Sequence, residues 1–185
     1  MTRIIAGKAG SLTLAVPGAG TRPTSDRVRE SLFGALESAD LIQDSAVLDL
    51  YAGSGALALE AVSRGAASAD LVELSPPAAT IAERNARTVG KSVPGVRIRV
   101  RRAAVDAFLR STNDAYDLVF IDPPYDIEDS DLAVVLALLV PRLKPAATII
   151  VERAARSAAP AWPDGLVPTR DRRYGDTMLW WSEPV

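Results

Sequence analysis

The sequence contains no cysteine and no histidine among its 185 residues. The absence of cysteine excludes disulfide bridges and thiolate nucleophiles, and the absence of histidine excludes imidazole bases. Zinc and iron sites that depend on these two residue types are excluded as well, and we expect no metal site. Any chemistry must therefore use carboxylates, hydroxyls, backbone groups or an organic cofactor.

Long apolar runs and a strong excess of one charge are also missing. The longest apolar run, 132–140, is too short to cross a bilayer, and the opening MTRIIAGKAG lacks the apolar core of a signal peptide. We therefore expect a cytoplasmic protein with no membrane partner. A formal net charge of −2 disfavours a protein that coats nucleic acid, although residues 1–29 carry five basic side chains against one acidic one. A local basic face is therefore expected at this end of the chain.

The apolar fraction of 48% is enough for one domain with a substantial core. From residue 46 onward, β-type runs alternate with helical segments. The β-type runs are 46–51, 69–74, 96–100, 116–121 and 147–152, and the helical segments are about 56–64, 76–89, 103–111 and 129–143. This alternation predicts an α/β fold with parallel strands. Two further β-type runs flank Tyr174-Gly175-Asp176 and predict a hairpin that brings the last strand into the sheet antiparallel.

The first part of the chain is predicted to form a separate hairpin. Residues 3–16 read as two short strands around the turn at 7–10, and a loop follows. A helix is predicted to begin at Thr24 or Ser25, where a hydroxyl can cap the first turn. We therefore expect a hairpin extension over residues 1–20 and a main domain over residues 21–185.

A glycine-rich turn follows the first strand of the main domain. The stretch LDLYAGSGALALEA places Gly53, Gly55 and Ala58 in a G-x-G-x-x-A arrangement between a strand and a helix. Glycines there allow a sharp turn and let a ligand approach bare backbone, while the helix N-terminus offers unpaired N–H groups. A tight turn without a ligand is the alternative reading of this motif.

An acidic side chain ends the second strand. Glu73 lies 18 residues after Gly55, at the position where one carboxylate can accept hydrogen bonds from both hydroxyls of a ribose. A solvated glutamate is the alternative, but together with the glycine turn this spacing predicts an adenosine-type cofactor. A nicotinamide dinucleotide would also need a hydride partner, for which no candidate follows the fourth strand. S-adenosyl-L-methionine needs only a place for its amino acid tail, which Asp49 and the turn backbone can supply, so we favour it.

The fourth strand ends in FIDPPYD, residues 120–126. The carboxyl ends of parallel strands line the ligand crevice, so Asp122 is expected on the same side as Gly53 and Glu73. The two prolines hold the backbone rigid, and the Asp122 carboxylate and Pro123 carbonyl can orient a planar exocyclic amine. Tyr125 then offers a face on which a flipped-out base can stack. An ordinary loop with a packed tyrosine is the alternative.

These motifs resemble those of a known class of enzymes. GSGALALEA, Glu73 and DPPY resemble the class I S-adenosylmethionine-dependent methyltransferases that modify amino nitrogens. RIIAGKAG, TRPTSDRVRESLFGAL and LDLYAGSGALALEAVSRGA are similar, along nearly the whole chain, to the RsmD family, which methylates the N2 amine of guanine(966) in 16S ribosomal RNA. The resemblance implies a Rossmann-like fold with a seven-stranded, mostly parallel sheet, an antiparallel last strand and an N-terminal β-hairpin extension. It also implies a monomer whose partner is ribosomal RNA, in the small subunit or in an assembly intermediate.

The resemblance further implies roles for individual residues. The amine site would be Asp122, Pro123 and Tyr125. The cofactor contacts would be Asp49, Tyr51, Gly53, Ser54, Gly55, Glu73, Leu74, Ala104, Val105 and Thr24. The RNA contacts would be Arg3, Lys8, Arg22, Arg27, Arg172 and Arg173. Segment 22–30 would close over the cofactor, the hairpin would face RNA, and adenine would be held by backbone groups near Ala104, with Asp106 as a possible side-chain contact.

Two other functions are compatible with the residues. One is an amino methyltransferase that acts on adenine N6 or cytosine N4 of DNA, or on a glutamine side chain, because the DPPY corner fits any planar amine. The other is a nucleic-acid-binding module with a vestigial methyltransferase fold. Methylation at cytosine C5 is disfavoured because that reaction ordinarily uses a cysteine nucleophile.

Overall fold

A seven-stranded sheet runs through the protein in the order β5-β4-β3-β6-β7-β9-β8. The computed structural model describes residues 1–18 and 24–185. The strands are β3 (Ala46–Leu50), β4 (Ser68–Glu73), β5 (Arg97–Arg102), β6 (Tyr116–Ile121), β7 (Leu143–Ala154), β8 (Leu166–Tyr174) and β9 (Thr177–Pro184). Strands β3 to β7 are parallel, whereas β9 is antiparallel to both β7 and β8. The predicted mostly parallel sheet with an antiparallel last strand is confirmed.

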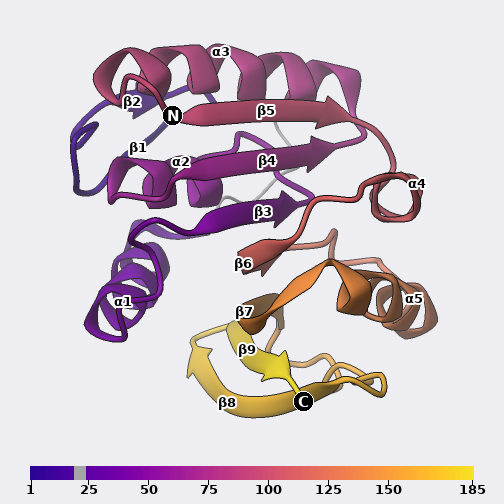
Figure 1. The fold of residues 1–185 in the computed structure, drawn as a ribbon. Helices are drawn as coiled ribbons and strands as arrows, with labels where there is room; N and C mark the ends of the chain where they lie inside the picture. The colour runs from indigo at the N-terminus through magenta and orange to yellow at the C-terminus, as the bar shows by residue number, and fades with distance from the viewer. Residues whose placement is uncertain (19–23) are drawn as a thin grey trace.

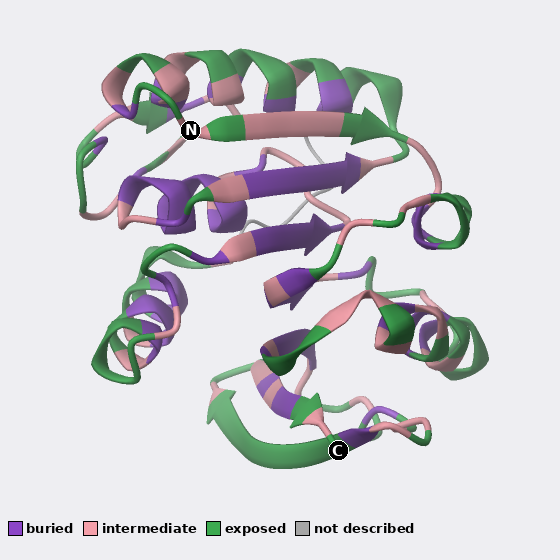
Figure 2. Ribbon diagram, in the orientation of Figure 1, coloured by how far each residue is buried: buried purple, intermediate pink, exposed green. Residues whose placement is uncertain are grey.

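Helices cover both faces of this sheet (Figure 1). They are α1 (Asp26–Ser38), α2 (Ala56–Ser63), α3 (Pro76–Ser92), α4 (Val105–Ser111) and α5 (Asp129–Leu139). The first three pack on one face, with Val47 and Phe120, and the last two pack on the other, with Leu48 and Val119. Successive strand residues thus point to opposite apolar layers, which is why the central strands read as continuous apolar runs. Figure 2 shows these strands buried between exposed helix surfaces.

Element boundaries follow local chemistry. Ser25 caps α1, because its Oγ accepts a hydrogen bond from the Val28 N–H at 3.3 Å. The helix expected to reach residue 143 instead ends at Leu139 and continues as a short 3₁₀ turn, Val140–Arg142. Pro141 has no N–H to continue the α-helical hydrogen bonding, so the longer helix was wrong. The helix expected from residue 103 begins at Val105, since β5 extends to Arg102.

The N-terminal hairpin has shorter strands than expected. Within the described residues the paired strands are β1 (Thr2–Arg3) and β2 (Thr13–Leu14). Ile4 still exchanges hydrogen bonds with Leu12 and Ser11 across the hairpin, whereas the backbone that follows Ile4 binds helix α2. The Glu60 carboxylate accepts the N–H groups of Ile5 and Ala6 at 2.8 and 3.0 Å. A Cβ at Gly7 would lie 2.0 Å from the Ser63 carbonyl oxygen, so this close approach requires glycine.

The hairpin shares its buried core with α1 and α2, through Ile4 and Leu14. The boundary expected at residue 20, and Arg22, lie outside the described residues. Among the residues that the structure describes, no helix is long and apolar enough to cross a membrane.

Candidate active site

Two adjoining cavities open at the carboxyl ends of β3, β4 and β6. The first cavity, of about 510 Å³, is lined by nine of the expected site residues, namely Thr24, Asp49, Tyr51, Gly53, Ser54, Glu73, Asp122, Pro123 and Tyr125. The second cavity, of about 600 Å³, is lined by the expected Leu74, Ala104 and Val105, and also by Asp106. Tyr51 and Glu73 line both cavities, so the two lie side by side, and together they are called the crevice below.

The glycine turn after β3 is shaped by packing beneath it and by open space above it. Gly53 and Gly55 have φ angles of +55° and +81°, and Tyr51 has +63°. A Cβ at Gly55 would lie 2.4 Å from Leu71 Cδ2, so the core excludes a side chain there. A Cβ at Gly53 would meet nothing within 4 Å, and this residue lines the first cavity. The open space over Gly53 therefore suits a ligand that lies against the backbone.

Glu73 ties the end of β4 to this turn. Its Oε2 accepts the Gly53 N–H at 2.8 Å, and its Oε1 accepts the Ser75 N–H at 2.9 Å. A carboxylate oxygen has more than one acceptor site, so both oxygens retain capacity for a further hydrogen bond. Glu73 is thus oriented by the backbone in a way that fits two ribose hydroxyls.

Asp49 lies beneath the first cavity. Its side chain is 1% exposed, and its Oδ2 accepts the Ala58 N–H at 3.1 Å. Burial raises the pKa of Asp49 to about 8; the Ala58 N–H opposes this shift and the charge of Glu73 adds to it. A positively charged ligand group next to Asp49 would therefore be strongly favoured.

Arg29, on α1, brings the opposite charge to the same cavity. Its side chain is 1% exposed, and its Nη2 donates to Thr2 Oγ1, the Arg3 carbonyl and Asp26 Oδ1 at 2.7–2.9 Å. Nη1 lies 3.8 Å from Glu60 Oε2, and neither Nε nor Nη1 has a hydrogen-bond partner among the described residues. Buried donors of this kind are normally satisfied by an ordered water or by a ligand, and the carboxylate of a ligand could accept hydrogen bonds from them.

The crevice therefore fits S-adenosylmethionine by its charges as well as its shape. The methionine tail of that molecule carries an amino group and a carboxylate, which match Asp49 and Arg29. The open backbone at Gly53 and the acceptors of Glu73 match its ribose. In the sequence, Arg29 was not named as a site residue; it belonged to a basic segment and to segment 22–30, which was expected to close over the cofactor. Its spacing from Leu32, Phe33 and Leu36 places it on the buried face of α1, and this was the available signal.

The segment 122–125 after β6, together with Glu152, is called the acceptor corner below. It contains two carboxyl groups, those of Asp122 and Glu152, which the Thr24 hydroxyl joins. Thr24 Oγ1 lies 2.9 Å from Glu152 Oε2 and 3.4 Å from Asp122 Oδ2. Burial raises the pKa of Asp122 well above its ordinary range, helped by the charges of Glu152 and Asp49 and opposed by Thr24. Burial also raises the pKa of Glu152, which is 9% exposed. Protons are therefore held at this corner more tightly than on exposed carboxyls.

Glu152 was not among the site residues predicted from the sequence. It ended a predicted strand, but nothing in the sequence set the order of the strands. In the structure β7 pairs with β6 so that Val151 is the partner of Ile121, which places Glu152 beside Asp122. The signal was an acidic residue at the end of another strand, and only the strand order makes it meaningful.

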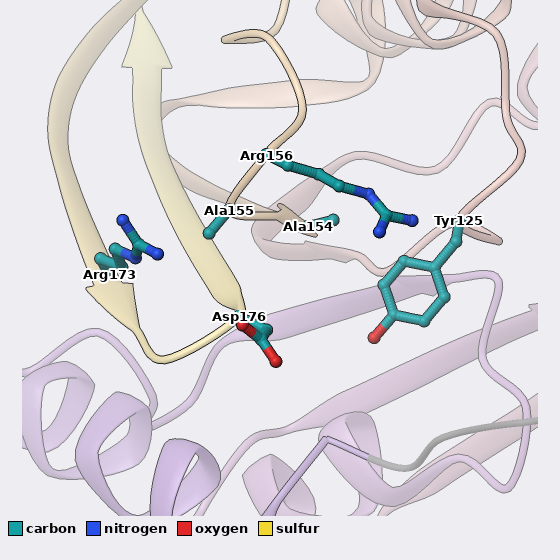
Figure 3. Close-up of a pocket in the computed structure, with 6 residues that line it drawn as sticks. All are labelled: Tyr125, Ala154, Ala155, Arg156, Arg173 and Asp176. Carbon is teal, nitrogen blue, oxygen red and sulfur yellow. The ribbon is translucent and has the colours of Figure 1, made fainter.

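A third cavity, of about 370 Å³, lies on the other side of Tyr125. Figure 3 shows its lining, which consists of Tyr125, Ala154, Ala155, Arg156, Arg173 and Asp176. Tyr125 is 58% exposed and also lines the first cavity, so it stands between the two. Pro123, near the start of the loop that follows β6 and carries Tyr125, is buried.

The basic residues expected to contact RNA are not all brought together. Arg3, Lys8, Arg27 and Arg172 are exposed, and only Arg173 lines one of these three cavities. The Lys8 N–H donates to the Ser63 carbonyl at the C-terminal end of α2, whereas the N-terminal end of α2 faces the crevice. Lys8 therefore lies away from the crevice.

Comparison with known proteins agrees with this geometry. A putative methyltransferase, yhhF, from Escherichia coli superposes with a TM-score of 0.84 at 34% identity, covering 99% of this chain and 97% of that one. The putative rRNA methyltransferase YlbH of Bacillus subtilis is 33% identical over 95% of both chains. Ribosomal RNA small subunit methyltransferase D of E. coli is 41% identical over 66% of this chain, and that match spans 60% of the relative's length.

A family model described as conserved hypothetical protein 95 matches residues 2–183. The match includes the hairpin, the glycine turn, the acceptor corner and most of β9. The methyl donor that this family and fold imply is S-adenosylmethionine, in agreement with the charges of the crevice. The chain therefore belongs to this family, the RsmD family of methyltransferases.

Proposed function

We propose that the protein transfers a methyl group from S-adenosylmethionine to the N2 amine of one guanine in small-subunit ribosomal RNA. The observation that carries this proposal is that the expected cofactor residues and the expected amine site line the same cavity. Glu73 and Asp122 line one cavity, so a cofactor on the glycine turn and an amine at the DPPY corner would meet in it. The names of the E. coli and B. subtilis relatives support ribosomal RNA as the substrate.

The cofactor would be held at its methionine tail, at its ribose and at its adenine. Asp49 would bind the amino group of the methionine tail, Arg29 its carboxylate, and Glu73 the ribose hydroxyls. The adenine would lie in the second cavity against the backbone at Ala104 and Val105, as proposed from the sequence. When bound, S-adenosylmethionine supplies an electrophilic methyl group on a sulfonium centre.

The acceptor corner would orient the substrate amine. Asp122 Oδ and the Pro123 carbonyl would accept its two N–H groups, which directs the nitrogen lone pair toward the methyl group. Because Pro123 and Pro124 fix the backbone, little ordering entropy would remain to be lost at the reaction step. Tyr125 would stack on the flipped guanine, which typically contributes about 1–3 kcal/mol.

The nitrogen must lose one proton after the methyl group has been transferred. Asp122 would lie closest to that proton in this arrangement, and once cofactor binding has ionised it, its raised pKa would make it a better proton acceptor than an exposed aspartate. Thr24 connects it to Glu152, which would share the charge. Ribosomal RNA as substrate also supports a cytoplasmic protein. We further propose a monomer that binds RNA phosphates through Arg3, Arg27 and Arg172.

The test is transfer of labelled methyl from S-adenosylmethionine to small ribosomal subunits from cells that lack the gene, followed by nucleoside analysis. We expect N2-methylguanosine at one site. Asp122→Ala should abolish turnover and leave calorimetric cofactor binding nearly intact, whereas the exposed control Asp164→Ala should behave as the parent protein. Full activity of Asp122→Ala would refute the amine site. Methylation only of DNA or of a glutamine side chain would move the function to those substrates.

A further inference from the structure

We infer that the third cavity binds the RNA nucleotide next to the target guanine, with Arg156 and Arg173 holding its phosphate. This inference rests on the proposed function. Tyr125 lines both this cavity and the first, so a guanine held at Asp122 would have its sugar-phosphate backbone leaving past Tyr125. The neighbouring nucleotide would then lie over Ala154 and Ala155.

The charge of the cavity suits one phosphate. Arg156 and Arg173 contribute two positive charges and Asp176 one negative charge, and neither arginine forms an ion pair within the described part of the chain. Figure 3 shows the Arg156 guanidinium extending toward the Tyr125 ring, while Arg173 lies on the hairpin strand across the cavity. Two guanidinium groups on opposite walls can hold a phosphate from two directions.

Arg173 differs from its neighbours on β8. Arg170 lies over the Trp181 ring at 4.1 Å and Arg172 over the Tyr174 ring at 5.2 Å, so both follow the surface of the hairpin. Arg173 instead donates from Nε to the Gly175 carbonyl at 2.9 Å, at the turn between β8 and β9. This hydrogen bond restricts the orientation of an otherwise exposed side chain.

The walls of the cavity are also fixed to each other. The Ala155 N–H donates to the Asp176 carbonyl at 2.7 Å, which joins the end of β7 to the turn between β8 and β9. Such a preformed site loses little entropy when a nucleotide binds.

Asp176 gives the site a preference for RNA. A carboxylate repels phosphate, so the phosphate must lie on the arginine side, and Asp176 then faces the sugar. A ribose 2′-hydroxyl can donate a hydrogen bond to it, whereas deoxyribose has no such group.

The experiment compares full-length Arg156→Gln and Arg173→Gln with the parent protein, using Arg110→Gln on α4 as an exposed control. Binding of a fluorescent single-stranded RNA carrying the target sequence is measured with S-adenosylmethionine present, over a range of salt concentrations. Each variant should weaken binding at least about fivefold and reduce the slope of log affinity against log salt by up to about 0.7, the value for complete loss of one phosphate contact to a single strand. The cofactor dissociation constant should be unchanged.

The same RNA is also compared with its 2′-deoxy form. The parent protein should prefer RNA, and Asp176→Asn should reduce that preference. Parent-like RNA affinity and salt slope in both arginine variants would overturn the inference, and circular dichroism melting checks that the variants are folded. The proposed function is judged separately, by whether the parent protein forms N2-methylguanosine, so either idea can fail alone.

Discussion

Binding of the cofactor should release protons, because the crevice holds a carboxyl that is neutral in the free protein. Burial raises the pKa of Asp49 from 3.8 to about 8, so at pH 6 this side chain carries a proton. The amino group of S-adenosylmethionine favours the ionised carboxylate. Linkage then makes cofactor affinity rise with pH by up to about tenfold per unit below about pH 8, and level off above that.

The raised pKa of Asp49 also affects the stability of the cofactor-free protein. Between about pH 4 and 8 the unfolded chain has ionised Asp49 while the folded chain keeps its proton, so the folded state binds more protons. The contribution of Asp49 to stability is therefore greatest in acid and falls as pH rises through this range. Thermal melting of Asp49→Asn should depend less on pH than melting of the parent protein.

The assay is titration calorimetry of cofactor binding at pH 7 in two buffers with different ionisation enthalpies. The parent protein should release more protons than Asp49→Asn, by up to one per molecule. Some release should persist in the variant, because the pKa values of Asp122 and Glu152 are also raised. Asp164→Asn, at an exposed site, should match the parent. Equal proton release by the parent and Asp49→Asn would refute this reasoning.

Three further substitutions test the packing and hydrogen bonds of the crevice. Glu73→Ala should weaken calorimetric cofactor binding at least about tenfold, or about 1.4 kcal/mol, because charge-assisted ribose bonds are lost; an unchanged affinity would contradict that role. Gly55→Ala should lower the free energy of unfolding in urea by about 1–3 kcal/mol, since φ is +81° and the new Cβ would lie 2.4 Å from Leu71; parent-like stability would show that the turn adapts. Glu60→Gln should cost about 3 kcal/mol in the same assay by removing the buried negative charge that Arg29 and Arg64 share, and a fully stable variant would argue against these pairs.

The sequence predicted the sheet and the position of the crevice because both depend on local patterns. Buried parallel strands are short apolar runs, and their carboxyl ends meet at one edge of the sheet. Gly53, Glu73 and Asp122 each end or follow such a run, so the sequence alone is enough to predict that they meet.

The features that the sequence did not predict depend on contacts between segments that are distant in the chain. Glu152 matters only because β7 lies beside β6, and Arg156 matters only because the β8–β9 hairpin folds over the end of β7. The hairpin strands β1 and β2 are short because Glu60 and Ser63, more than 50 residues later, bind the backbone between them. Neither alternation nor motif spacing contains such information.

Because β9 lies between β7 and β8 in the sheet, the strands cannot join the sheet in the order in which they are synthesised. Strand β8 is made before β9 but, among the strands that the structure describes, it pairs with β9 alone, so it cannot join the sheet until β9 has left the ribosome. Strands β3, β4 and β6 need neither of them. A nascent chain can therefore assemble the cofactor side of the crevice first, and it gains the wall that carries Arg173 and Asp176 only as its last strand enters.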